Sequence, residues 1–196
     1  MYFFSADLHL GNDEILVREA RPFASIEAFE EAFIQNVNQV ASEEDTLYIV
    51  GDWFNYNSAY KLPPSDSISI IPRIRPRIVL IMGNGEDRIA RDLFGGFEGF
   101  RDYCLKAGFA DVMPDCFLSF GDRQFYLNHY PSRYKNGYIN LFGHTHRATG
   151  LWKPYGLNVG VDLNCYRPFS ETDILDLVDT KENWWDIDKD CLCMGD

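Results

Sequence analysis

The chain has few of the features that mark secreted, membrane-spanning or disulfide-stapled proteins. Its five cysteines stand at scattered positions, and Cys191 and Cys193 have no second pair to complete a zinc ribbon. Its longest aliphatic run, residues 78–82, is too short to cross a bilayer, and no basic region precedes the apolar N-terminus. We therefore expect a cytoplasmic protein with free thiols and no membrane span.

Basic residues are also scarce. The 196 residues contain 18 Lys and Arg against 30 Asp and Glu, which gives a net charge of -12. Contacts from Lys and Arg to phosphates dominate the affinity of proteins for long nucleic acids, so binding of that kind is not expected. No internal repeat, low-complexity tract or linker interrupts the chain, and its length suits one domain of ordinary size, spanning residues 1–196.

The order of strand-like and helix-like segments predicts an α/β fold. Segments rich in β-branched and aromatic residues indicate strands at residues 2–6, 46–50, 77–82, 117–120, 124–128, 138–142 and 157–161. The early strand, helix, strand order and the closely spaced later strands predict two sheets packed as a sandwich, with helices outside.

Helical spacing is clearest after Ser25, a typical N-cap residue. Apolar residues recur there at Phe29, Phe33, Val37 and Val40, so we expect an amphipathic helix that ends near residue 41. Residues 86–94 and 97–107 are predicted to form two more helices. Residues 54–76 have little periodicity, which predicts a surface excursion.

Four short polar motifs follow the predicted strands in a fixed order. They are Asp7-Leu8-His9, Gly51-Asp52, Gly83-Asn84, and His129 followed by Gly143-His144-Thr145-His146. Taken singly, an Asp after a strand or a Gly-Asn pair is usually a turn residue or a cap. Together the motifs contain all four histidines of the chain and supply the ligands of a two-metal hydrolytic centre.

The spacing within the motifs adds to this prediction. Residues two apart in a strand point to the same side, so Asp7 and His9 can reach one ion, as can His144 and His146. If the motifs converge, two divalent cations can share Asp52 as a bridging carboxylate and hold a hydroxide for in-line attack on phosphorus. The mixed carboxylate, amide and imidazole set suits Mn, Fe, Zn or Ni.

The order of these motifs resembles that of the calcineurin-like metallophosphoesterase superfamily, over residues 1 to about 175. Connecting segments are similar to those of its small bacterial and phage branch: Arg21-Pro22-Phe23, Asp45-Thr46-Leu47-Tyr48, His129-Tyr130-Pro131, Asn158-Val159-Gly160-Val161-Asp162 and Arg167-Pro168-Phe169-Ser170. The resemblance implies a single metallophosphoesterase domain with four layers, α/β/β/α. It also implies one metal held by Asp7, His9, Asp52 and His146, and another held by Asp52, Asn84, His129 and His144.

Two positions depart from the pattern of this family. Where the family reads Gly-Asn-His followed by an acid, this chain has Gly83-Asn84-Gly85-Glu86, so the histidine that assists the leaving oxygen is absent. A general acid contributes roughly 100- to 10,000-fold, and its loss affects poor leaving groups most. Asn12 also replaces a histidine that is common in this branch.

We therefore predict a metal-dependent phosphoesterase that hydrolyses a small phosphodiester or activated phosphomonoester through a metal-bound hydroxide. Asp52, Asn84 and His129 would act at the reaction centre, while Arg133 and Arg147, close to ligands in the sequence, would contact the phosphate. Two alternatives stay open. One is a catalytically weak protein that uses this fold as a binding scaffold, and the other is a nuclease acting on short oligonucleotides. The oligomeric state is not predicted.

Overall fold

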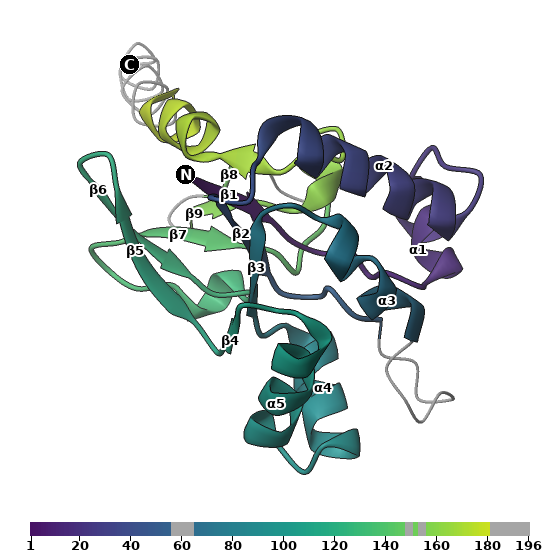
Figure 1. The fold of residues 1–196 in the computed structure, drawn as a ribbon. Helices are drawn as coiled ribbons and strands as arrows, with labels where there is room; N and C mark the ends of the chain where they lie inside the picture. Colours follow the sequence, from purple (N-terminus) through teal and green to yellow (C-terminus); the bar gives the residue numbers. More distant parts are fainter. Residues whose placement is uncertain (56–64, 148–150, 153–155, 181–196) are drawn as a thin grey trace, which may run out of the picture.

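The protein contains two five-stranded β-sheets packed face to face and flanked by helices (Figure 1). The computed structural model describes residues 1–55, 65–147, 151–152 and 156–180. The strand order is β10-β1-β2-β3-β4 in the first sheet and β5-β6-β7-β9-β8 in the second. The expected α/β class, with two packed sheets and helices around them, is confirmed.

The first sheet is parallel except at one edge. Its parallel strands are β1 (Tyr2–Ser5), β2 (Thr46–Val50), β3 (Arg77–Ile81) and β4 (Asp111–Met113), and β10 (Phe169–Ser170) pairs antiparallel with β1. The second sheet is mixed and contains β5 (Cys116–Phe120), β6 (Arg123–Leu127), β7 (Ile139–Phe142), β8 (Leu151–Trp152) and β9 (Gly156–Asn158). Sequence patterns do not predict the strands β4, β8 and β10. Each has only two or three residues, which is too few to show the alternation of apolar and polar residues that indicates a strand.

The helices are α1 (Asp13–Arg18), α2 (Ile26–Val40), α3 (Ser65–Ser69), α4 (Asn84–Leu93) and α5 (Phe97–Ala107), and residues 171–180 form another. Short 3-10 helices are η1 (Ile71–Arg73), η2 (Pro131–Arg133) and η3 (Val161–Leu163). The predicted cap of α2 is present, since the Ser25 side chain accepts a hydrogen bond from the Ala28 N–H. Asn12 caps α1 in the same way, through the Glu14 N–H.

The first sheet is buried on both faces, as parallel sheets generally are. Alternate strand residues, such as Leu47 and Ile49, pack with α2, α4 and α5 in one hydrophobic cluster. Their neighbours Tyr48 and Val50 face the second sheet in another cluster. On the outer face of that second sheet, Tyr126 is buried against Phe117 and the Asp115 carboxylate.

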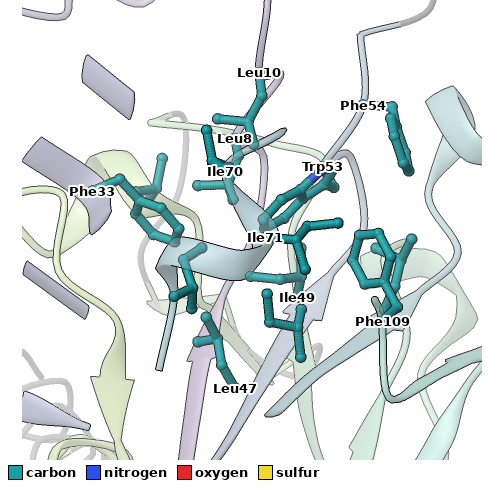
Figure 2. Close-up of a cluster of buried hydrophobic side chains, with 14 of the residues drawn as sticks. Leu8, Leu10, Phe33, Leu47, Ile49, Trp53, Phe54, Ile70, Ile71 and Phe109 are labelled. Carbon is teal, nitrogen blue, oxygen red and sulfur yellow. The ribbon is translucent and has the colours of Figure 1, made fainter. Parts of the chain in front are cut away.

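Part of the predicted surface excursion belongs to the core. Figure 2 shows Ile70 and Ile71 beside Trp53, and all three side chains are buried. The Trp53 indole N–H donates to the Ser67 carbonyl at 2.9 Å. The prediction of a surface excursion over residues 54–76 is therefore wrong for the buried residues Phe54, Ser67, Ile70, Ile71 and Ile74. The helices in this segment are too short to show an apolar period in the sequence. Residues 56–64 lie outside the described residues.

Two other sequence-based expectations concern thiols and membranes. Cys104, Cys116 and Cys165 are free thiols, as predicted, whereas Cys191 and Cys193 lie outside the part that the structure describes. Within that part, no helix combines the length and the apolar character that crossing a membrane requires.

The packing of α2 against the first sheet leads to a stability prediction. Phe33 is fully buried in the cluster, so Phe33→Ala should lower the free energy of unfolding by about 3–5 kcal/mol, through lost burial and a residual cavity. Val40 ends the same helix and is 48% exposed, so Val40→Ala should change it by no more than about 0.5 kcal/mol. Urea unfolding checks both values, and equal losses in the two variants would contradict this packing.

Candidate metal centre

The predicted ligands gather where strands of both sheets end. Asp7 and His9 follow β1, Asp52 follows β2, and Asn84 is the first residue of α4, after β3. From the second sheet, His129 follows β6, while His144 and His146 follow β7. An isolated parallel bridge between Ala6 and Gly160 ties the two groups of loops together.

The spacing of these residues predicts that extended strands present their side chains, but the structure places them on left-handed turns instead. Left-handed backbone conformations occur at Asp7 (φ 61°), His9 (51°), Asp52 (56°), His144 (71°) and His146 (48°). Each costs a non-glycine residue on the order of 1–3 kcal/mol, and such strain concentrates at functional sites. Backbone hydrogen bonds hold these turns, including Asp7 N–H to the Gly51 carbonyl and His9 N–H to the Asp52 carbonyl.

One cluster consists of Asp7, His9 and His146, which can each direct one donor atom so that all three atoms lie within 4.8 Å of one another. Asp7 Oδ2, His9 Nε2 and His146 Nδ1 are buried and have no hydrogen-bond partner among the described residues. Buried polar atoms are nearly always paired, and an unpaired one is costly. A carboxylate oxygen and two imidazole nitrogens left in this state fit a metal cation.

A second cluster, Asp7, Asp52 and His129, has donor atoms equally close together. His129 Nδ1 lies 3.0 Å from the Val50 carbonyl oxygen, so this nitrogen carries the hydrogen and Nε2 keeps its lone pair. That lone pair faces another acceptor, Asn84 Oδ1, at 3.0 Å, and Asn84 Oδ1 also lies 3.0 Å from His144 Nδ1. A cation between these atoms would relieve the contact between two acceptors.

Asp52 belongs to the second cluster, which shares Asp7 with the first, and it also approaches His9. Its Oδ2 atom is 3.5 Å from His9 Nε2 and 3.6 Å from His129 Nε2. The other carboxylate oxygen, Oδ1, accepts a hydrogen bond from the Gly85 N–H at 2.9 Å. This geometry suits the bridging role expected for Asp52.

Burial shifts the proton affinities of these groups in opposite directions. It raises the pKa of Asp52 to about 6, and together with the Asp52 charge it raises the pKa of Asp7 well above its usual value. Burial lowers the pKa of His129 to about 4 and holds the pKa of His9 well below its usual value. The imidazoles are therefore neutral, as metal ligation requires.

Two buried ionisable side chains that sequence reasoning did not single out hold the ligand loops in place. Arg21 donates to the Asp7 carbonyl at 2.7 Å and to the Leu8 carbonyl at 2.9 Å, while it pairs with the Asp162 carboxylate. Glu86 accepts hydrogen bonds from the Asp52, Phe54 and Gly83 N–H groups. The position of Glu86, three residues after the helix cap Gly83, was a usable signal, because it matches a capping box. No local pattern indicates the pairing of Arg21 with Asp162.

Gly85 is placed where a side chain has little room. Its backbone is helical rather than left-handed, but a Cβ atom added there would lie 3.0 Å from the Phe54 carbonyl oxygen and 3.2 Å from Asp52 Oδ1. Glycine at this position allows the start of α4 to approach Asp52. A histidine could not be accommodated unless the loop or the helix moved.

The structure places the two predicted phosphate-contacting arginines at the edge of the site. Arg147 donates to the Glu19 carbonyl at 2.6 Å. The Arg133 guanidinium lies 4.5 Å from the centre of the Tyr130 ring, which in turn contacts the His144 ring. A third cation, Arg18, was not predicted, and its Nη2 atom lies 3.4 Å from His146 Nε2.

Comparisons with known proteins identify a similar fold. Neither a family model nor a curated protein sequence matches the chain. A solved protein of unknown function, AQ665 from Aquifex aeolicus, aligns with a TM-score of 0.64 and 22% identity, over 90% of this chain and 98% of that one. This likeness establishes the fold alone.

Two other solved structures align less closely. A novel archaeal phosphodiesterase has a TM-score of 0.45 and 12% identity, over 81% of both chains. Yfce, a phosphoesterase from E. coli, has a TM-score of 0.47 and 16% identity, over 81% of this chain and 77% of that one. At these scores neither likeness bears on function, which has to be argued from the site.

The raised pKa of Asp52 predicts how the chelator-treated protein responds to pH. A carboxyl whose pKa rises from 3.8 to about 6 on folding contributes stability below pH 3.8 and loses it as the pH rises through 6. The free energy of unfolding of Asp52→Asn should therefore be about 1–3 kcal/mol higher than that of the parent at pH 7, and it should not be higher at pH 3.5.

Metal should reverse that order, because it stabilises only the form that binds it. Saturating Mn should raise the melting temperature of the parent protein and leave that of Asp52→Asn unchanged. The exposed Asp102→Asn on α5 serves as the control and should behave like the parent. If Asp52→Asn melts at a lower temperature than the parent in chelator at pH 7, the burial cost assigned to Asp52 is wrong.

Proposed function

We propose that the chain is a metal-dependent phosphoesterase with a binuclear centre, which hydrolyses a small phosphodiester or an activated phosphomonoester. The observation that carries this proposal is the pair of adjacent donor clusters, with three buried ligand atoms that lack any hydrogen-bond partner among the described residues. Two bound cations would supply Lewis-acid activation of water and neutralise charge on the phosphoryl oxygens. The donor set favours Mn, Fe, Zn or Ni.

The side chains have distinct roles in this proposal. Asp7, His9 and His146 hold one ion, and Asn84, His129 and His144 hold the other, while Asp52 bridges them. His129 is fixed by its Nδ1–H bond to the Val50 carbonyl, so its Nε2 stays aimed at the centre.

Positive charge for the phosphate comes from arginines at the rim. Arg18 stands beside His146 and is 57% exposed, so it can reorient toward a bound anion. Arg133 on Tyr130 and Arg147 beside Glu19 flank the same loops. We assign Arg18 and Arg133 to phosphate contact, and Arg147 chiefly to holding the turn at His146 against Glu19.

The scaffold alternative is less well supported by the geometry. A protein that only binds a partner gains nothing from left-handed strain at five candidate ligand positions, or from buried ligand atoms that have no hydrogen-bond partner among the described residues. The nuclease alternative concerns the substrate rather than the chemistry. The net charge of -12 disfavours long strands and leaves short oligonucleotides as substrates to be tested.

The first test uses protein that has been stripped of metal and reloaded with Mn, Ni, Zn or Fe. Turnover of a bis-aryl phosphodiester should depend on the metal, and Asp52→Asn should lower it by more than about 100-fold, with loss of bound metal. Asp162→Asn, which removes only a partner of Arg21, should cost about 10- to 100-fold, as loss of an outer partner typically does. If elemental analysis finds two ions per chain in Asp52→Asn, the bridging role of Asp52 is wrong. If the metal-loaded protein hydrolyses neither an ester nor a short oligonucleotide, the proposed function is wrong.

A second test concerns the leaving group. No histidine stands at position 85 to protonate the departing oxygen, so turnover of aryl methyl phosphates should fall steeply as the pKa of the leaving phenol rises. Gly85→His should not flatten this dependence and should weaken metal binding, because its Cβ would press on Asp52 and on the Phe54 carbonyl. A flat profile for the parent, with chemistry rate-limiting, would mean that another group such as Tyr130 supplies the proton.

A further inference from the structure

A cavity of about 380 Å³ lies at the ends of β3 and β4, and its lining includes Asp87, three residues after the candidate ligand Asn84. Met82 follows β3 and Pro114 follows β4, and both line the cavity. The helices α4 and α5, which lie side by side in Figure 1, provide the rest of the wall. In open α/β sheets, ligands bind at this carboxyl edge of the strands.

The cavity and the centre share one face of α4. Asn84, Asp87 and Arg91 are three and four residues apart and so lie on the same side of the helix. At 1.5 Å per residue, Asp87 is about 4.5 Å and Arg91 about 10.5 Å along the helix from Asn84.

The lining combines apolar walls with two opposite charges. Met82, Ala90, Phe97 and Pro114 are apolar, and Asp87 and Arg91 are the charged residues of the lining. Gly95 and Gly96 contribute main chain only, and a Cβ atom at either position would meet nothing within 4 Å. Ligand sites of this size are typically apolar with a few polar groups that set orientation.

We propose that this cavity binds the nucleoside half of a phosphodiester whose phosphate lies at the metal centre, a proposal that rests on the function above. Asp87 lies between Asn84 and Arg91, so a second phosphate at that point would meet a carboxylate. An uncharged ring that carries hydrogen-bond donors fits instead, since its hydroxyl or N–H groups can donate to Asp87. The face of its base can pack on Phe97, while Arg91 can donate to a carbonyl group of the base.

Binding can be tested without any turnover. Thymidine, added to the ¹⁵N-labelled, chelator-treated protein, should shift the amide signals of Met82, Ala90 and Phe97 by NMR, whereas inorganic phosphate should not. Asp87→Asn should weaken thymidine binding about 5- to 10-fold, as loss of a charged acceptor does, and Asp102→Asn should leave it unchanged. Absence of these shifts, or equal binding by Asp87→Asn, would overturn the assignment.

Kinetics on the metal-loaded enzyme separate this proposal from the function it rests on. Thymidine 5′-p-nitrophenyl phosphate and methyl p-nitrophenyl phosphate share a leaving group. The KM of the nucleoside ester should be about 5- to 10-fold lower than that of the methyl ester. Asp87→Asn should abolish this difference. Equal KM values for two hydrolysed esters would refute the subsite and leave the phosphoesterase intact. Thymidine binding without hydrolysis of either ester would refute the phosphoesterase and retain the cavity as a nucleoside site. If phenyl p-nitrophenyl phosphate matches the nucleoside ester, the apolar wall alone selects the ligand and the role of Asp87 is wrong.

Discussion

Two buried carboxylates that lie close together are the constraint on which the rest of the site depends. Asp7 is fully buried and Asp52 nearly so, and they belong to one donor cluster with His129. Isolated buried charges are costly, so a fold keeps them only where another interaction offsets the cost. Arg21 offsets only a small part of this cost for Asp7, because its guanidinium binds the Asp7 carbonyl and the Asp162 carboxylate rather than the Asp7 carboxylate. A cation held between the clusters is the compensation that this geometry accommodates.

The close approach of the loops that carry the candidate ligands explains the glycine that precedes such a residue in three of the motifs. A Cβ atom on Gly51 would collide with the His129 ring, and one on Gly83 would collide with the Asp52 carboxylate. At Gly143 it would lie 2.7 Å from the Ala6 Cβ atom. These glycines are therefore required by packing between ligand loops, and Gly85 extends the same packing into α4. Glycine at position 85, where the resembled family has a histidine, thus allows the helix to approach Asp52.

The start of α4 links the centre to its surroundings. The main chain of this helix and its Glu86 side chain bind the loop that carries Asp52, while its Asn84 side chain contacts two histidines of the second sheet. The next residues on the same face, Asp87 and Arg91, line the neighbouring cavity. A single helix can thus position a candidate metal ligand and the cavity wall together, and rigid elements hold such groups more accurately than loops do.

The sequence by itself determined the α/β class, the long helix after Ser25 and the identity of the clustered polar residues. Those features depend on local patterns: the period of apolar residues, a cap, and polar motifs that each follow a strand. The tertiary structure decided the rest. Local sequence patterns do not predict the left-handed turns at Asp7 and Asp52. Nor do they predict the pairing of Arg21 with Asp162, which lies 141 residues away in the sequence. The same holds for the burial of Ile70 and Ile71 and for the cavity beside α4, because contacts between distant segments create them.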